Sequence, residues 1–514
     1  MQMMTVAVKQ GKGEGEVAEV LVAGHFEDDA SLKGDAATVD TALGGALRAF
    51  LRCKEFEGKN QQIVVLHTQG KIPAKRVLLV GLGKKQDARL DTIRQAMGCV
   101  AKRVRQIGAS SLVTPVLGQG IPHTTPLELA QAMTEGALLG LYQFNEYRTD
   151  QNGGGTSLSR MTLIETRTDR VATLREGVRR GRAGAEAAGF VRDLCNHPSN
   201  VMTPSRVAVE ARAIGKERGV KVKILEQKKV EQLGMGAFLG VARGSHEPPK
   251  FIILEYRGGG RGSNGKTDKP IVLVGKTITF DTGGISLKPA ENMEQMKADM
   301  TGGAEVLATI RAAARLQLPL HVIGILPATE NMPGGRAIKP GDILKTLSGK
   351  TVEVQNTDAE GRLILADGLA YACRLKPAAV VDIATLTGAC AVALGQFAIG
   401  MFGNQDGLKA EIREAGNRAG ERVWEMPLWD DYFEQLKSDV ADMRNIGGRG
   451  GGMITAALFL SKFVESGVPW VHLDIASTDW SERERAYIPK GPTGIGTRLL
   501  IQYLIDQSTR KAER

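Results

Sequence analysis

Charged side chains follow several apolar runs in the C-terminal half of the sequence. Lys276 comes directly after IVLVG, and Asp281 lies five residues further on in TFDTGG. Asp358 and Glu360 follow VEVQ in NTDAEGR, and Asp299 precedes a Gly-Gly pair at the start of a predicted helix. Four carboxylates that meet in one place repel one another and are costly to desolvate, so positive charge must compensate them. Two divalent metal ions bridged by carboxylates would do this and would activate water for hydrolysis.

The sequence has no HExxH or CxxC motif, and its seven histidines are isolated. A single zinc ion held by histidines is therefore not expected, whereas oxygen ligands suit zinc, manganese or magnesium. Lys276 could join these ligands only in its neutral form, which a metal ion and a buried setting can enforce. Lys288 and Arg362 are two further cations in the same stretches of sequence.

Each of these residues also has an ordinary structural explanation. Lys276 could end a strand with an exposed ammonium group, and Asp281 before Thr-Gly-Gly is a common turn former. Asp358 and Glu360 could form an acidic loop, with Asp358 or Thr357 capping the helix that follows. For any one residue the structural explanation is favoured. The whole set at predicted strand ends, accompanied by Lys288 and Arg362, favours a site.

Alternating strands and helices must position this set. A buried strand is predicted for each of PIVLVGK, HVIGILPATE, TVEVQNTD, AAVVDIATLTG and VPWVHLDIAST, and helices are predicted for GGAEVLATIRAAARL, ILADGLAYACRL and ITAALFLSKFV. The alternation indicates an α/β fold with a central, mostly parallel sheet covered by helices on both faces. In such sheets ligands bind beyond the carboxyl ends of the strands, where Thr385 and Leu386 also fall.

A smaller α/β domain is expected ahead of this one. Its strands are predicted from VAEVLVAG, QQIVVLHTQG and RVLLVGLG, and its helices from TALGGALRAFLRC and LDTIRQAMGCVAKRVRQI. A polar break at 149–157 and a long helix after it mark the boundary. The sequence thus divides into an N-terminal domain at 1–168, a connecting helix at 169–195 and a catalytic domain at 196–514, with a surface loop at 257–270.

The composition indicates a soluble cytoplasmic protein. The 514 residues are enough for two domains, and the five scattered cysteines argue against a disulfide framework. No apolar run is long enough to cross a membrane, and the first residues lack a signal core. Between Lys71 and Arg105, however, ten basic residues face only two acidic ones, a local net charge of +8. A basic segment of this kind is more often a solvated helix surface, but it keeps DNA binding open as a second function.

Several motifs resemble one known family. NTDAEGRL at 356–363 resembles, letter for letter, the signature of the leucyl aminopeptidase family, also called cytosol aminopeptidases. VGKTITFDTGGISLKP at 274–289 and MEQMKADMTGGAEV at 293–306 look like its other metal-binding blocks, and DIATLTGA at 382–389 looks like its substrate-binding strand end. RDLCNHPSNVMTPSRVAVEA at 192–211 is similar to the start of its catalytic domain. The resemblance covers nearly all of 190–500 and is looser in the N-terminal domain.

The resemblance implies a metal-dependent aminopeptidase that releases leucine and other apolar residues from the N-terminus of short peptides. Asp281 and Glu360 would bridge two metal ions, Lys276 and Asp299 would complete the tighter site, and Asp358 would complete the more exchangeable one. The implied metals are manganese or zinc, with magnesium as a further candidate. Family members form hexamers in the cytoplasm, so a homohexamer is expected.

The resemblance also implies the groups that act on the substrate. Lys288 and Arg362 would be the catalytic pair, with Lys288 stabilising the oxyanion and Arg362 holding a bicarbonate ion that serves as the general base. The implied substrate-binding residues are Met296, Asn356, Thr385, Leu386 and Gly388.

Three positions depart from the family pattern. Thr277 and Ser477 stand where glycine is usual, and Pro492 stands where alanine is usual. Thr277 adjoins a metal ligand and could therefore alter metal preference or loop geometry, although activity is expected to survive.

Two other functions compete with the peptidase. DNA binding or regulation on the same scaffold rests on the basic segment, and a two-metal phosphoesterase is disfavoured by the isolated histidines.

Overall fold

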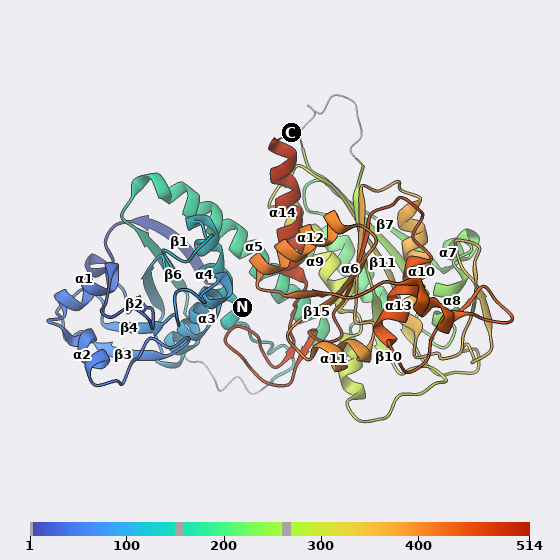
Figure 1. Cartoon of the computed structure of the whole chain (residues 1–514), viewed down its shortest axis with the longest axis horizontal. Coiled ribbons are helices and arrows are strands. Elements are labelled where there is room, and N and C mark those ends of the chain that lie inside the picture. Colours follow the sequence, from blue (N-terminus) through green and yellow to red (C-terminus); the bar gives the residue numbers. More distant parts are fainter. Residues whose placement is uncertain (1–3, 150–157, 260–268, 514) are drawn as a thin grey trace. The chain divides into compact units, whose positions relative to one another are not determined.

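The structure is a computed structural model, and it describes residues 4–149, 158–259 and 269–513. Most of the predicted break at 149–157 and of the predicted loop at 257–270 lies outside the described residues. The chain forms two compact units (Figure 1). The first comprises Met1–Glu186 and Arg483–Lys490, and the second comprises Ala187–Glu482 and Gly491–Arg514. Their boundary falls inside α5 (Val171–Asn196), the long helix that the sequence predicts.

The first unit is built on one six-stranded sheet with the order β1-β6-β5-β2-β4-β3. All neighbours in it are parallel except β3 and β4. Its strands are β1 (Thr5–Gln10), β2 (Val20–His25), β3 (Ile63–His67), β4 (Arg76–Gly81), β5 (Ser111–Pro115) and β6 (Arg160–Glu165).

Helices cover both faces of this sheet. Because side chains alternate along a strand, Val20 and Val22 of β2 pack with α3 (Leu90–Gln106) and α4 (Pro126–Gly140), whereas Leu21 and Ala23 pack with α1 (Gly34–Ala42) and α2 (Ala46–Arg52). The sequence predicts one helix over TALGGALRAFLRC, but α1 and α2 are separate. Gly44 and Gly45 between them adopt φ of 70° and 87°, a left-handed conformation that ends a helix.

A late segment of the chain belongs to this first unit. Within Arg483–Lys490, the Tyr487 hydroxyl donates a hydrogen bond of 2.5 Å to Asp91, and the Arg485 carbonyl accepts one of 2.7 Å from Lys102. A side chain at Gly98 would lie 2.8 Å from the Ala486 carbonyl oxygen, so glycine lets the segment rest directly on α3.

The second unit contains a nine-stranded sheet in the order β16-β15-β18-β14-β9-β11-β8-β7, with β10 paired to β11. Its centre is parallel and β7, β8 and β15 run antiparallel to their inner neighbours. The strands are β7 (Val220–Glu226), β8 (Lys250–Arg257), β9 (Ile271–Gly275), β10 (Thr277–Asp281), β11 (His321–Asn331), β14 (Ala379–Ala384), β15 (Ile399–Gly403), β16 (Val423–Glu425) and β18 (Trp470–Asp474).

The helix that follows Asp299 and the helix that begins with Glu360 lie on opposite faces of this sheet. Gly324 of β11 faces Val306 and Ile310 of α9 (Thr301–Arg315), while its neighbours Ile323 and Ile325 join the core that includes α10 (Glu360–Cys373). The other helices are α6 (Pro204–Ile214), α7 (Gln227–Leu233), α8 (Gly236–Ala242), α11 (Gly388–Leu394), α12 (Asp406–Ala419), α13 (Gly452–Ser461) and α14 (Thr497–Glu513). The two-domain α/β fold predicted from the sequence is therefore confirmed.

One predicted strand lies elsewhere. TVEV forms β13 (Thr351–Glu353), which pairs with β12 (Ile343–Lys345) and β17 (Met443–Arg444) in a separate small sheet. Asp358 and Glu360 therefore reach the site from a loop and the start of α10, not from the edge of the main sheet. A two-stranded sheet of β19 (Trp480–Ser481) and β20 (Gly491–Pro492) completes the unit. Among the described helices, none is long and apolar enough to cross a bilayer.

Candidate metal centre

Four segments bring the predicted charged residues together. Lys276 follows β9, and Asp281 is the last residue of β10. Asp299 lies between the short helix at Met293–Ala298 and α9, and Glu360 is the first residue of α10.

Lys276 is the centre of the first group of contacts. Its ammonium nitrogen lies 2.8 Å from Asp299 Oδ1 and 2.8 Å from Glu360 Oε1, and it donates a hydrogen bond of 2.9 Å to the Thr385 carbonyl. The Thr385 hydroxyl donates to the same Asp299 oxygen at 2.6 Å. All four side chains are buried. A charged lysine and its acidic partners are thus fixed in one orientation.

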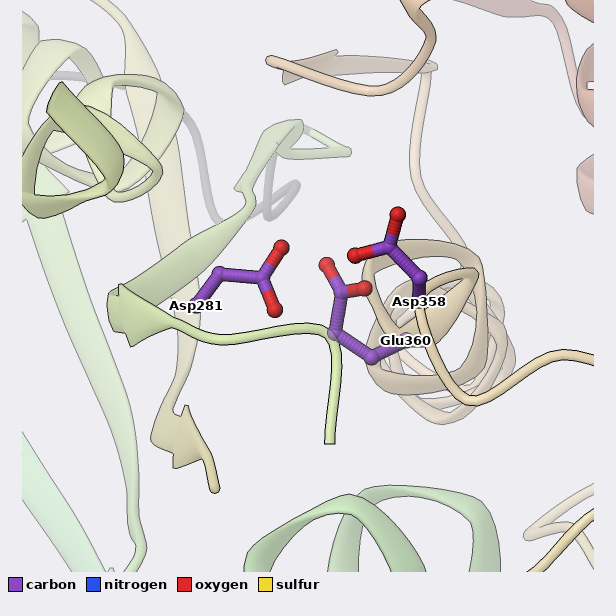
Figure 2. A group of neighbouring side chains, drawn as sticks. All are labelled: Asp281, Asp358 and Glu360. Atoms are coloured by element: carbon purple, nitrogen blue, oxygen red, sulfur yellow. The ribbon is translucent and has the colours of Figure 1, made fainter. Parts of the chain in front are cut away.

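Lys288 is the centre of the second group. Its nitrogen lies 2.8 Å from Asp281 Oδ2 and also pairs with Asp358. Oxygens of Asp281, Asp358 and Glu360 all lie within 4.8 Å of one another. Figure 2 shows the Glu360 carboxylate between those of the other two, with Asp281 reaching in from a strand end. One cation can therefore contact carboxylates from two distant parts of the chain.

The carboxylates have spare binding capacity. Among the described residues, nothing donates a hydrogen bond to the buried Asp299 Oδ2 or Glu360 Oε2. Burial raises the pKa of Asp299 well above its usual value, and it raises the pKa of Glu360, with Asp281 adding repulsion. Burial alone would lower the pKa of Lys276, but Asp299 and Glu360 outweigh it and raise that pKa. Buried acids with bare oxygens fit the donor set that hard divalent cations require.

Arg362 is the third residue of the same helix, and its side chain is buried. Its Nη1 donates a hydrogen bond of 2.8 Å to the Asn445 carbonyl, while its Nε has no acceptor among the described residues. Burial lowers its pKa to about 10, against the opposing effect of Glu360 and Asp474, so the group stays cationic at neutral pH. A buried guanidinium with a spare N–H is suited to binding a small anion.

Three buried residues support the site without having been predicted. Asn331, the last residue of β11, donates one hydrogen bond of 2.7 Å to Asp281 Oδ1 and another of 3.0 Å to the Thr357 carbonyl. Asn445 donates to the Asn356 carbonyl at 2.6 Å. Asp474, at the end of β18, accepts a hydrogen bond of 2.7 Å from the Thr387 hydroxyl. The position of Asn331 and Asp474 at strand ends is a signal that could have identified them.

The residues predicted to bind substrate lie around these contacts. Thr385 touches both Lys276 and Asp299, as described above, and the Leu386 N–H donates to Asp474 at 3.2 Å. The Asn356 side chain accepts a hydrogen bond of 2.8 Å from the Asp358 N–H. Met296 is half-buried three residues before Asp299, and Gly388 is exposed with open space at its α-carbon.

The three departures from the family pattern are accommodated by their surroundings. A side chain at Gly303 of α9 would meet the Thr277 hydroxyl at 2.1 Å, so Thr277 fills space that this glycine leaves free. Its hydroxyl donates to the Gly275 carbonyl at 2.9 Å. The Ser477 hydroxyl donates to the Ala398 carbonyl at 2.7 Å, and Pro492 pairs with Trp480 in the two-stranded sheet. The Lys276 contacts are intact beside Thr277.

A mostly parallel sheet with acidic residues gathered near the carboxyl ends of its central strands, together with a buried arginine, is typical of metal-dependent hydrolases of the α/β class. The catalytic-domain model of the cytosol aminopeptidase family matches residues 189–501, and the model of its N-terminal domain matches residues 20–151. The chain therefore belongs to the cytosol aminopeptidase family and is a metal-dependent aminopeptidase.

Individual relatives resemble the chain over nearly its whole length. A probable cytosol aminopeptidase of Geotalea uraniireducens is 47% identical over 482 residues, which are 94% of each chain. One from Geobacter sulfurreducens is 45% identical over 503 residues, 98% of this chain and 99% of the relative. Among solved structures, a mutant of tomato leucine aminopeptidase has a TM-score of 0.87 at 32% identity, covering 98% of this chain and 96% of that one. The bottromycin maturation enzyme BotP in complex with Mn has a TM-score of 0.84 at 36% identity, covering 96% and 100%.

Proposed function

We propose that this aminopeptidase releases leucine and other apolar residues from the N-terminus of short peptides and uses two divalent metal ions to do so. The observation that carries the proposal is the meeting of Asp281, Asp358 and Glu360, whose oxygens lie within 4.8 Å of one another. The bare oxygens of Asp299 and Glu360 extend this donor set toward Lys276. The names of two relatives, a leucine aminopeptidase and an enzyme in complex with Mn, agree with the substrate and with manganese as one metal.

Five residues would hold the metal ions in this proposal: Lys276, Asp281, Asp299, Asp358 and Glu360. When bound, the metal ions would supply a polarised water molecule and a binding point for the α-amino group of the peptide. Lys276 gives up its proton only where another cation takes the place of its charge beside Asp299 and Glu360, since these acids raise its pKa. Asn331 keeps Asp281 in the orientation that the site needs.

The remaining residues would act on the substrate. Lys288, which is held at the site by Asp281 and Asp358, can donate a hydrogen bond to the oxygen that becomes negative as the peptide carbonyl is attacked. The free N–H of Arg362 can hold bicarbonate, and this ion would supply a general base there. Half-buried Met296 and Leu386 offer apolar contacts to a leucine-like first residue.

Removal and return of metal tests this function. The chain is stripped with a chelator, and release of leucine from leucine p-nitroanilide is measured before and after zinc, manganese or magnesium is added. We expect activity to disappear on stripping and to return with at least one ion, with no hydrolysis of p-nitrophenyl phosphate. Full activity in the stripped protein would refute the two-metal proposal, and phosphate release would favour a phosphoesterase.

DNA binding is the second candidate function. It rests on the basic segment Lys71–Arg105, but Arg94 is buried against Glu135, and Lys75 and Lys102 pair with Glu19 and Glu484. These pairs reduce the positive charge available to phosphates. Peptide hydrolysis therefore stands first, and a gel shift of the full chain at low and high salt tests the alternative, because binding that is absent at low salt excludes it.

A further inference from the structure

Glu305 is a buried acid that takes no part in the metal centre. It lies on α9 with an exposed fraction of 0%, and no group of the described chain donates a hydrogen bond to either of its carboxylate oxygens. Burial raises its pKa well above the usual value, with further repulsion from Glu421 and Asp479. Buried polar groups in proteins nearly always have a partner, so this carboxylate requires one.

The oxygens of Glu305 face the start of α14. A Cβ at Gly496 would lie 2.7 and 2.8 Å from the two oxygens, and the φ of 117° at this residue also favours glycine. Thr497, the next residue, begins α14, which packs against α9. Thr309 lies one turn after Glu305 on the same face of α9. The Glu305 carboxylate thus lies directly beside the backbone at Gly496, at the start of α14.

Two more oxygens in this region lack a partner. The hydroxyls of Thr309 and Thr497 are fully buried and, within the described chain, form no hydrogen bond. Together with the two oxygens of Glu305, they make four bare oxygens on α9 and at the start of α14. Among the described residues, no lysine, arginine or histidine nitrogen forms an ion pair with Glu305. The group is therefore rich in electron-pair donors and poor in positive charge.

The neighbouring acid is already compensated. Glu421 Oε2 accepts hydrogen bonds from the N–H groups of Gly496 at 3.0 Å and Leu499 at 2.8 Å, and Glu421 Oε1 lies 3.1 Å from Arg498 Nε. Arg498 Nη1 is in turn bonded to the Ala419 carbonyl. Arg498 is thus committed to Glu421, and the negative charge of Glu305 needs a separate counter-ion.

We propose that Glu305, Thr309 and Thr497 bind a monovalent metal cation, Na+ or K+, between α9 and α14. Carboxylate and hydroxyl oxygens are ligands that hard cations prefer. A single positive charge neutralises the single carboxylate, whereas a divalent ion would leave a net charge in a buried place. A proton would neutralise the acid but would leave the other oxygens without a partner. The ion would fasten the C-terminal helix to the helix that follows Asp299.

Melting temperature in different salts tests this site. The metal-loaded full-length protein is measured by calorimetry at mildly alkaline pH in sodium, potassium or tetramethylammonium chloride at equal concentration. We expect a melting temperature about 1 °C higher in at least one of the alkali salts, the shift that an ion at ten times its Kd would give a protein of this size. The shift should be absent in Glu305→Gln and retained in Glu434→Gln, an exposed control on a short helix.

Two further measurements keep the proposal testable if Glu305→Gln does not fold. Thr497→Val preserves the shape of the side chain and the Glu305 carboxylate, and it should reduce the salt-specific shift. A crystal soaked in thallium(I) should show anomalous density beside Glu305. The same melting temperature in all three salts would overturn the site. The proposal would also be overturned if Glu305→Gln kept the full difference in melting temperature between the salts. If Glu305→Gln does not fold, the same result in Thr497→Val would overturn it.

Discussion

At the scale of single residues, the candidate metal centre depends on carboxylate oxygens that form no hydrogen bond within the described chain. Glu360 uses one oxygen for Lys276 and leaves the other bare, although the side chain is almost completely buried. A glutamine side chain has nearly the same shape, so it could replace Glu360 with little loss of packing. Its chemical contribution is the negative charge, which separates its proposed role in catalysis from its role in folding.

Glu360→Gln should therefore remove activity without unfolding the protein. In the proposed two-metal site Glu360 bridges the ions, so its loss would weaken both metal positions and cost several kcal/mol of transition-state stabilisation, or at least about a thousandfold in kcat/KM. Hydrolysis of leucine p-nitroanilide measures the loss, and circular dichroism checks the fold. Activity close to that of the parent, with a full complement of metal, would show that Glu360 does not bridge the ions.

Asn331→Ala should weaken metal binding rather than abolish catalysis outright. The change removes the hydrogen bonds that orient Asp281 and join it to the Thr357 segment. Loss of a residue that orients a metal ligand commonly lowers metal affinity by about 10- to 100-fold. Titration of manganese into the stripped protein measures the effect. Asn417→Ala, an exposed change on α12, is the control. Equal affinity in the two variants would exclude an orienting role for Asn331.

At the scale of elements, the fit between β10 and α9 explains how Thr277 is tolerated beside Lys276. Gly303→Ala should cost about 1–3 kcal/mol, because the new methyl group would overlap the Thr277 hydroxyl. Thr277→Gly should also destabilise by leaving a cavity. The double variant should recover much of both losses. Denaturant unfolding of the four proteins measures this coupling, and additive losses would mean that the two residues are independent.

Asp367 on α10 makes the stability of the second unit depend on pH. It accepts hydrogen bonds from the N–H groups of Leu347 at 2.7 Å and Phe238 at 2.9 Å, and burial raises its pKa to about 7. The unfolded value is about 3.9, so the folded state holds the proton more tightly. The stability linked to this proton is fully present below about pH 4 and is lost as the pH rises through about 7.

Asp367→Asn should flatten this part of the pH profile, because an amide does not titrate. The free energy of unfolding in guanidinium, measured between about pH 4 and pH 8, gives the slope that changes. Asp431→Asn, an exposed change, should leave the slope as it is in the parent. A parent-like slope in the buried variant would assign the titration to other groups.

The main strands and helices of the second unit could be predicted because their apolar patterns are long and regular. Lys276 follows such a strand directly and Asp281 ends the next one, which are positions where the rule for parallel sheets predicts ligand-binding residues. The small sheet around Thr351–Glu353 could not be predicted in this way, since a three-residue strand looks the same whichever sheet it joins. Asn445 could not be identified either, because its role depends on tertiary contacts with Asn356 and Arg362 far away in the sequence.

At the scale of the whole molecule, we propose that the chain assembles as a homohexamer. The family resemblance supports this, and so do large apolar side chains that a lone chain leaves in water: Phe397 (62% exposed), Trp424 (64%), Trp429 (63%) and Val440 (66%). Light scattering after size exclusion should give six times the chain mass of 55.1 kDa. A mass of 55.1 kDa at working concentration would contradict the proposal.

The segment Arg483–Lys490 has a consequence for how the protein is made. Its Tyr487 hydroxyl and Arg485 carbonyl form hydrogen bonds with α3 of the first unit. The rest of that unit comes from Met1–Glu186, much earlier in the chain. During synthesis, the last contacts of the first unit can therefore form only after nearly the entire polypeptide has left the ribosome. Its final consolidation is a late event in biogenesis, and premature termination anywhere before this segment would release a first unit that is incomplete.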